Sequence, residues 1–130
     1  MNLKGGLSDI LVKDIMTKAI VSVDSSTTVY QVAKMMEQGG FGAILVKQDG
    51  HPHGIITDRD FAIKIAANKY AFDTPANKVA SHPLQTISSG ESILAAADIL
   101  STRKIRKLVV VEGEKIVGII TSTDIDRKST

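Results

Sequence analysis

The sequence contains no cysteine and no tryptophan, and aromatic residues make up only 4% of it. Without cysteine the chain can form neither disulfide bonds nor thiolate metal sites. Its few aromatic residues are scattered, whereas proteins that stack nucleic-acid bases display aromatic side chains together. The net charge of +2 is also small for a protein that binds a polyanion. The composition therefore excludes a disulfide scaffold and disfavours nucleic-acid binding.

Long apolar runs are missing as well, since none approaches the ~20 residues that a membrane helix needs. Residues 1–9 lack the apolar stretch of a secretory signal. The hydrophobic fraction of 43% and the charged fraction of 23% are ordinary for a globular protein. We therefore expect a cytoplasmic protein that does not associate with membranes.

Signatures of catalysis are missing too, including the phosphate-binding G-x-x-x-x-G-K-[ST], the nucleophile motif G-x-S-x-G and the zinc motif H-E-x-x-H. Asp58 and Asp60 form a carboxylate pair, but the sequence shows no base to work with them. His51 and His53 are predicted to lie in an exposed turn with no third metal ligand nearby. His82 is expected in a loop, where it could approach a phosphate. We expect no enzymatic activity, no metal site and no required cofactor.

An internal repeat organises the chain. When the sequence is shifted by 64 residues it overlays itself without a gap. The tetrapeptide G-I-I-T at residues 54–57 then falls on G-I-I-T at 118–121, and Asp60 falls on Asp124. Apolar positions coincide elsewhere, although identity is low. The pattern predicts two copies of one structural unit.

The residue pattern of each copy predicts the element order strand, helix, strand, strand, helix. The early strands are expected at residues 19–23 and 84–87, and the basic loop of the second copy at 103–107. The apolar spacing i, i+3, i+4, i+7 from residue 29 predicts the first helix, which Gly39 and Gly40 should end in left-handed conformations. Asp49 and Gly50 predict a tight turn between two strands. A last helix is expected at about 59–67.

The predicted boundaries are residues 8–67 for the first repeat, 68–77 for a linker and 78–130 for the second repeat, whose last helix is cut short. One helix and three short strands cannot bury both faces alone. We therefore expect an α+β, sandwich-like fold in which two βαββα repeats pack sheet to sheet with pseudo-two-fold symmetry. Clefts are expected where the copies meet.

The pattern G-h-h-T-x-x-D, where h is apolar, ends both repeats. Thr57 and Thr121 could cap the following helix or bind a ligand oxygen. Asp60 and Asp124 fall in the first helical turn, where a carboxylate is favoured and could accept two ribose hydroxyls. Capping alone is the alternative interpretation, and the two roles can coexist.

These paired ends, together with D-I-M-T at residues 14–17 and T-D-R-D at 57–60, are typical of one family. Over about residues 8–130 the chain resembles a stand-alone tandem pair of CBS (cystathionine β-synthase) domains, also called a Bateman module. The resemblance implies a flat regulatory module with two clefts for AMP, ADP, ATP or S-adenosylmethionine. It also implies homodimers and a role in signal transduction or energy sensing for a regulated partner.

The resemblance further implies that each nucleotide site combines the Thr-x-x-Asp end of one repeat with the early strand of the other. The first set is Thr57, Arg59, Asp60, Ala80, Leu84 and Gln85, and the second is Thr121, Thr123, Asp124, Met16, Ile20 and Val21. Positions near the phosphates match Arg106 and Lys107, while the first repeat has no charge there. We expect unequal sites whose phosphate affinity depends on Arg106, Lys107 and Arg59, unless that stretch is only a solvated loop.

Two other functions stay open at this point. The chain could be a protein-interaction module that binds no small molecule. It could also bind nucleic acid weakly through the basic residues 103–107, although composition disfavours this.

Overall fold

The computed structural model describes residues 9–129. Two predictions concern residues outside this range. They are the absence of a secretory signal in residues 1–9 and the outer repeat boundaries at residues 8 and 130. The elements are α2 (Val12–Ile15), β1 (Ser22–Asp24), α3 (Val29–Gly39), β2 (Ala43–Gln48), β3 (His51–Thr57), α4 (Asp58–Asp60), η1 (Phe61–Ile65), η2 (Ala76–Lys78), β4 (Thr86–Ser88), α5 (Ile93–Arg103), β5 (Lys107–Glu112), β6 (Lys115–Thr121) and α6 (Ser122–Ser129). The predicted α+β class and the two repeats are confirmed.

Two three-stranded sheets form the framework, in the orders β1-β2-β3 and β4-β5-β6. In each sheet the first strand is parallel to the central strand and the third is antiparallel to it. Ala43 is paired with Thr57 in one sheet and Lys107 with Thr121 in the other, so the register repeats at the same spacing of 64 residues. The sheets also share a bulge at equivalent positions, which shows that the repeat extends to backbone detail.

The two long helices have local start and stop signals. Thr28 caps α3 by accepting a hydrogen bond from the Gln31 N–H, and Ser92 caps α5 in the same way. Gly40 ends α3 in the left-handed conformation with φ = 71°. Gly39 is still helical, so the prediction that both glycines leave the helix was wrong for Gly39.

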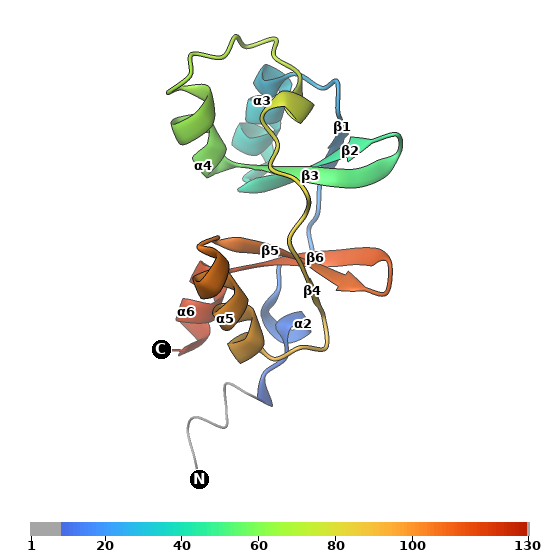
Figure 1. Ribbon diagram of the computed structural model, residues 1–130, viewed down its shortest axis with the longest axis vertical. Helices are drawn as coiled ribbons and strands as arrows, with labels where there is room; N and C mark the ends of the chain where they lie inside the picture. Colours follow the sequence, from blue (N-terminus) through green and yellow to red (C-terminus); the bar gives the residue numbers. More distant parts are fainter. Residues whose placement is uncertain (1–8, 130) are drawn as a thin grey trace. The chain divides into compact units, whose positions relative to one another are not determined.

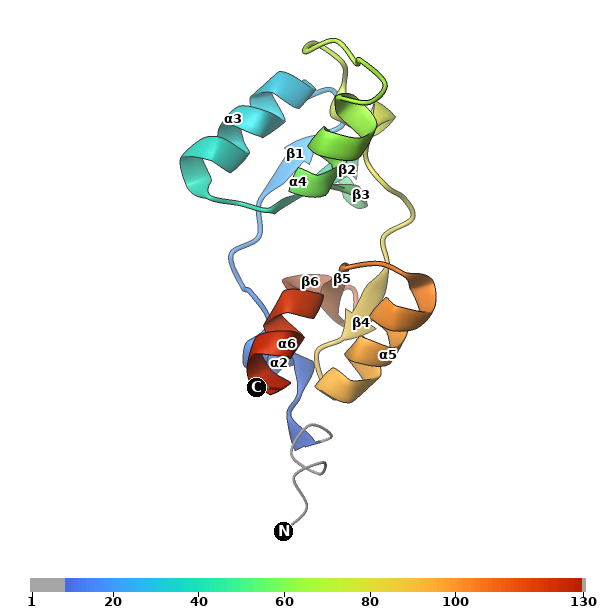
Figure 2. The same cartoon turned by 90° about the vertical axis from the view of Figure 1, so that its left-hand side faces the viewer.

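Each sheet is covered by helices on one face. Helices α3 and α4 lie on the same face of the first sheet, and α2, α5 and α6 lie on the same face of the second (Figures 1 and 2). Val32, Ile44 and Ile56 are fully buried in the first core, and Leu108 and Ile120 in the second. The second core also contains Val12, which belongs to the first repeat in sequence.

The first segments of the two repeats are exchanged. Within the described residues the chain forms two compact units, residues 21–84 (unit 2) and residues 9–20 with 85–129 (unit 1). Thr17 exchanges two backbone hydrogen bonds of 2.9 Å with Ile119, and Ser81 exchanges bonds of 2.9 and 3.0 Å with Ile55. Each short segment therefore completes the unit that contains the other repeat's sheet.

Glycines allow these exchanged segments to pack closely against the strands. A Cβ at Gly54 would lie 2.9 Å from the Ser81 carbonyl oxygen, and one at Gly118 would lie 2.9 Å from the Thr17 carbonyl oxygen. Real Cβ atoms do not come so close, so an alanine would push the segment away. The absence of a Cβ at the motif glycine thus permits the close approach of the two backbones.

Gly54→Ala and Gly118→Ala are each expected to lower the free energy of unfolding by about 1–3 kcal/mol, because overpacking forces the backbone to shift. Urea unfolding followed by circular dichroism measures the effect. The control is Gly90→Ala, since a Cβ there meets nothing within 4 Å and the change should stay within about 0.5 kcal/mol. If Gly54→Ala were as stable as this control, the close approach would be refuted.

The histidine-rich stretch corrects one prediction. His51 and His53 do not lie in a turn but in β3. The turn consists of Asp49 and Gly50, whose φ angles of 52° and 79° close a two-residue hairpin. Two residues suffice to reverse the chain, so the strand begins directly after Gly50.

Other element bounds also differ from the prediction. Strands β1 and β4 lie slightly later than residues 19–23 and 84–87 because pairing begins only where a neighbouring strand is available. The predicted helix at 59–67 is a short α-helical turn followed by a π-helix at Phe61–Ile65. Of the predicted basic loop 103–107, Arg103 belongs to α5 and Lys107 to β5.

Candidate functional site at the two strand-to-helix ends

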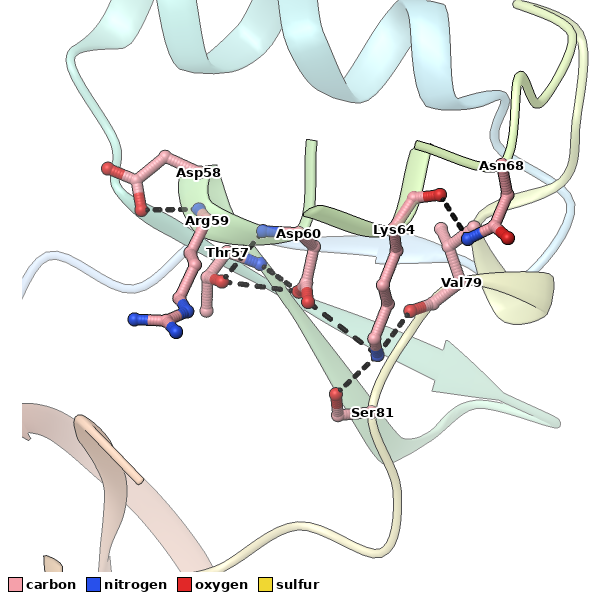
Figure 3. A network of polar contacts seen from close by, with 8 residues as sticks. All are labelled: Thr57, Asp58, Arg59, Asp60, Lys64, Asn68, Val79 and Ser81. Carbon is pink, nitrogen blue, oxygen red and sulfur yellow. Dashed lines mark hydrogen bonds and ion pairs between the residues drawn. The ribbon is translucent and has the colours of Figure 1, made fainter. Parts of the chain in front are cut away.

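The strand-to-helix end of unit 2 lies between β3 and α4. The Asp60 carboxylate accepts a hydrogen bond from the Thr57 N–H at 2.7 Å and lies 3.2 Å from the Thr57 hydroxyl (Figure 3). The Asp60 N–H donates in turn to the Thr57 hydroxyl at 3.4 Å. Threonine and aspartate thus form a reciprocal capping box, which fixes the orientation of the carboxylate.

The equivalent end of unit 1 lies between β6 and α6 and repeats this geometry. The Thr121 N–H donates to Asp124 Oδ2, and the Asp124 N–H donates to Thr121 Oγ1, both at 3.0 Å. The side chains of Asp60 and Asp124 are 13% and 11% exposed. The capping interpretation is therefore confirmed at both ends. Because a carboxylate has about four acceptor positions, capping leaves acceptor capacity for a ligand.

A cation accompanies each carboxylate, and neither cation was predicted from the sequence. Lys64 Nζ lies 3.6 Å from Asp60 Oδ1, and Arg127 Nη2 lies 2.9 Å from Asp124 Oδ1. The sequence signal for these ion pairs is the helical spacing between acid and base, which is four residues from Asp60 to Lys64 and three from Asp124 to Arg127. Their different positions mean that the two ends are not chemically identical.

The exchanged segments approach these ends within each unit. A Cβ at Gly118 would lie 2.6 Å from Met16 Sδ, and a Cβ at Gly54 would lie 3.0 Å from Ala80 Cβ. Met16 is therefore beside the strand that leads to Thr121. Ala80 is likewise beside the strand that leads to Thr57.

The remaining early-strand residues divide between the units. Leu84 falls in unit 2 and Ile20 in unit 1, together with the ends to which the sequence analysis assigned them. Val21 and Gln85 fall in the opposite units. The Val21 carbonyl accepts from the Leu45 N–H at 2.9 Å, so this residue belongs to the first sheet. Each unit by itself thus brings together most, but not all, of its expected set.

The proposed phosphate residues lie at the start of α6. The Arg106 carbonyl accepts a hydrogen bond from the Ser122 N–H at 2.9 Å, which places Arg106 directly beside this helix terminus. Its side chain is exposed, and Lys107 is paired with Thr121 in the sheet. The equivalent carbonyl in unit 2 belongs to Gly42, which accepts from the Asp58 N–H at 3.0 Å.

The unit 2 end has a different source of positive charge. Arg59, at the position equivalent to Thr123, is exposed in α4. Arg103 of unit 1 donates a hydrogen bond to the Gln85 side chain. The charge difference between the repeats predicted from sequence is thus present around equivalent backbone positions.

The histidines form no metal site that the structure supports. The rings of His53 and His82 are in contact, tilted by 31° with their centroids 4.8 Å apart. Within residues 9–129 no group of three or more His, Cys, Asp or Glu side chains could hold a metal ion. A phosphate role for His82 stays a prediction.

Over residues 9–129, no helix has the length and apolar character to cross a membrane.

The sequence matches a family model over nearly all of this architecture. The model of the CBS domain matches residues 12–67 and again residues 76–129. The chain belongs to the CBS-domain family. The two matched segments correspond to the two sequence repeats, so the chain contains a tandem CBS pair.

Relatives and solved structures agree with this assignment. The CBS domain-containing protein YhcV of Bacillus subtilis is 32% identical over 114 residues, which cover 88% of this chain and 81% of YhcV. The crystal structure of an uncharacterized conserved protein from Pyrococcus horikoshii superposes with a TM-score of 0.87 at 24% identity, covering 94% and 93% of the two chains, and shows the shared fold.

A third similar protein has been solved with ligands. The CBS domain pair of protein MJ0100, in complex with 5'-methylthioadenosine and S-adenosyl-L-methionine, has a TM-score of 0.78 and 28% identity, covering 91% of this chain and 94% of that one. Both molecules contain an adenosine-type nucleoside. CBS pairs are regulatory modules.

Proposed function

We propose that this protein is a non-catalytic regulatory module that binds adenosine-type molecules at its two strand-to-helix ends. The observation that supports the proposal most strongly is the repetition of one geometry at Asp60 and Asp124. Each carboxylate is largely buried, is fixed by its own capping box and keeps unused acceptor positions. A capping role alone does not require an exchanged segment to be seated beside each end.

In the proposed sites the carboxylates accept the two ribose hydroxyls. The N–H groups at the start of α6 and of α4 favour negative charge, which suits a phosphate or a carboxylate on the ligand. Met16 and Ala80, on the exchanged segments, would contact the base. Leu84 in unit 2 and Ile20 in unit 1 would add apolar contacts.

The two sites should differ in phosphate affinity. Arg106 and Lys107 lie beside the helix start in unit 1, while unit 2 offers only Arg59 and a glycine carbonyl at these positions. We therefore propose that AMP, ADP or ATP is preferred in unit 1. S-adenosylmethionine, which has no phosphate, would suit unit 2.

Adenosine, AMP, ATP and S-adenosylmethionine, each supplied at about 100 times its dissociation constant, are expected to stabilise the fold by about 2.7 kcal/mol. A thermal-shift titration measures this, with guanosine as the control for the base. Arg106→Ala combined with Lys107→Ala should lower the affinity for ATP and AMP but not for adenosine. Lys115→Ala, an exposed lysine in the same sheet, should change neither. No stabilisation by any adenosine compound at millimolar concentration would refute the proposed function.

The interaction-module alternative is supported by exposed apolar side chains. Tyr30 and Leu94 occupy equivalent positions in the two repeats and are 54% and 50% exposed. Such a repeated apolar position suits a second copy of the same chain, so we propose a homodimer rather than an unrelated partner. Sedimentation equilibrium measures the oligomeric state directly.

A further inference from the structure

Lys64 occupies a central position in unit 2 that its place in the sequence does not suggest. Its ammonium group donates to the Ser81 hydroxyl at 2.9 Å and to the Val79 carbonyl at 3.2 Å, and it lies 3.6 Å from Asp60 Oδ1 (Figure 3). One cation thus connects the proposed ribose-binding carboxylate with the exchanged segment. Two of its three N–H donors make hydrogen bonds to the exchanged segment, and the contact with Asp60 is an ion pair.

The backbone around Lys64 is built to hold it there. It lies in the π-helix, where the Ala66 N–H donates to the Phe61 carbonyl five residues earlier, at 3.0 Å. Single π-helical turns are frequent at functional sites. The Asn68 side chain donates to the Lys64 carbonyl at 2.7 Å and thereby closes this turn (Figure 3).

The other repeat differs at the equivalent position. The residue equivalent to Lys64 is Lys128, which is exposed, and Asp124 receives its cation from Arg127. The Arg127 side chain is 74% exposed, whereas that of Lys64 is 41% exposed. Among residues 9–129, the connection between carboxylate and exchanged segment through lysine is thus found in unit 2.

We propose that Lys64 is a positioning residue that holds residues 79–81 against the Asp60 end and so sets the ligand affinity of unit 2. This inference rests on the proposed function, because it assigns the ribose to Asp60 and the base to the segment around Ala80. The ammonium group fixes both parts at once, so a ligand finds the two walls already in place. Preorganisation of this kind raises affinity by removing the ordering that binding would otherwise require.

The test is an amide-resolved NMR experiment on the full chain, using adenosine as the probe. Lys64→Met removes the ammonium group but keeps the apolar stem. It is expected to raise the dissociation constant reported by the Thr57 amide about tenfold and to speed hydrogen exchange at the Ser81 amide about tenfold. The Thr121 and Thr17 amides should report unchanged values in the other unit.

Two variants provide the controls. Lys128→Met, the equivalent change in the other repeat, should affect neither the Thr57 nor the Ser81 amide. Lys64→Arg keeps a cation, so its adenosine affinity at Thr57 and its hydrogen exchange at Ser81 should be closer to those of the wild type than in Lys64→Met. Exchange at the Leu45 amide, which donates to Val21 in the same unit, should stay as in the wild type. A merely structural loss would speed exchange at Leu45 and Ser81 together.

The outcomes separate this inference from the proposed function. Unchanged Ser81 exchange in Lys64→Met would overturn the positioning role whether or not adenosine binds. Faster Ser81 exchange with unchanged affinity at Thr57 would overturn the link to the ligand. If adenosine perturbed no amide of the wild type, the proposed function would fail, and the claim on ligand affinity with it.

Discussion

Asp60→Asn is expected to weaken adenosine binding in unit 2 about a hundredfold, and Asp124→Asn to do the same in unit 1. Hydrogen bonds to a charged acceptor contribute about 1.5–3 kcal/mol each, and asparagine offers a neutral oxygen in place of the carboxylate. A loss of about 2.8 kcal/mol corresponds to a hundredfold change in the dissociation constant. NMR titration at the Thr57 and Thr121 amides measures the two sites separately.

The choice of asparagine separates ligand binding from helix capping. Its remaining oxygen can still accept from the Thr57 or Thr121 N–H, as the aspartate does. The control is Thr28→Ala, which removes an N-cap from α3 and should lower stability by about 1 kcal/mol without changing adenosine affinity. If Asp60→Asn left the affinity at Thr57 intact, the ribose role of this carboxylate would be refuted.

Val12→Ala is expected to lower the free energy of unfolding of unit 1 by about 2–3 kcal/mol. Val12 is fully buried in the core that contains Leu108 and Ile120, although all its sequence neighbours belong to the first repeat. The removed methyl groups leave a cavity in the core that packs against the sheet of the second repeat. Hydrogen exchange should therefore become faster in β5 and β6 rather than in β2 and β3.

Val32→Ala is the matched variant, because Val32 is equally buried in the other core. It should speed exchange in β2 and β3 instead. The exchanged arrangement would be contradicted if Val12→Ala affected β2 and β3 more strongly than β5 and β6. Native-state hydrogen exchange in mild denaturant resolves the two regions by residue.

Much of the fold was predictable because its signals are local. The caps at Thr28 and Ser92 and the turn at Asp49 and Gly50 depend on residues only a few positions apart. The repeat is visible because two copies of such local patterns occur 64 residues apart. The π-helix at Phe61–Ile65 was missed, since a one-residue difference in hydrogen bonding leaves the apolar spacing nearly unchanged. The strand bounds of β1 and β4 also shifted, because pairing with a distant strand defines them.

The candidate site was predictable to the extent that it is a capping motif. Thr57 and Asp60, like Thr121 and Asp124, are three residues apart and meet wherever a helix follows the strand. Lys64 was missed as a link because its partners Val79 and Ser81 lie 15 and 17 residues away. No local pattern reports a contact of that range.

The sequence by itself determined that the protein consists of two equivalent halves, with a threonine–aspartate end on each. Only the tertiary structure decided which first segment completes which unit. Each repeat has a glycine, at residue 54 or 118, that allows a first segment to pack closely against its strand. The local pattern therefore fits a first segment from the same repeat and one from the other repeat equally well. Resemblance to the family implied the exchanged pairing, and the hydrogen bonds of Thr17 with Ile119 and of Ser81 with Ile55 show it. A first segment could pair with the sheet of its own repeat or with that of the other repeat, and the residues of the segment alone do not distinguish the two. The packing of Val79 into the first core and of Val12 into the second selects the exchanged pairing.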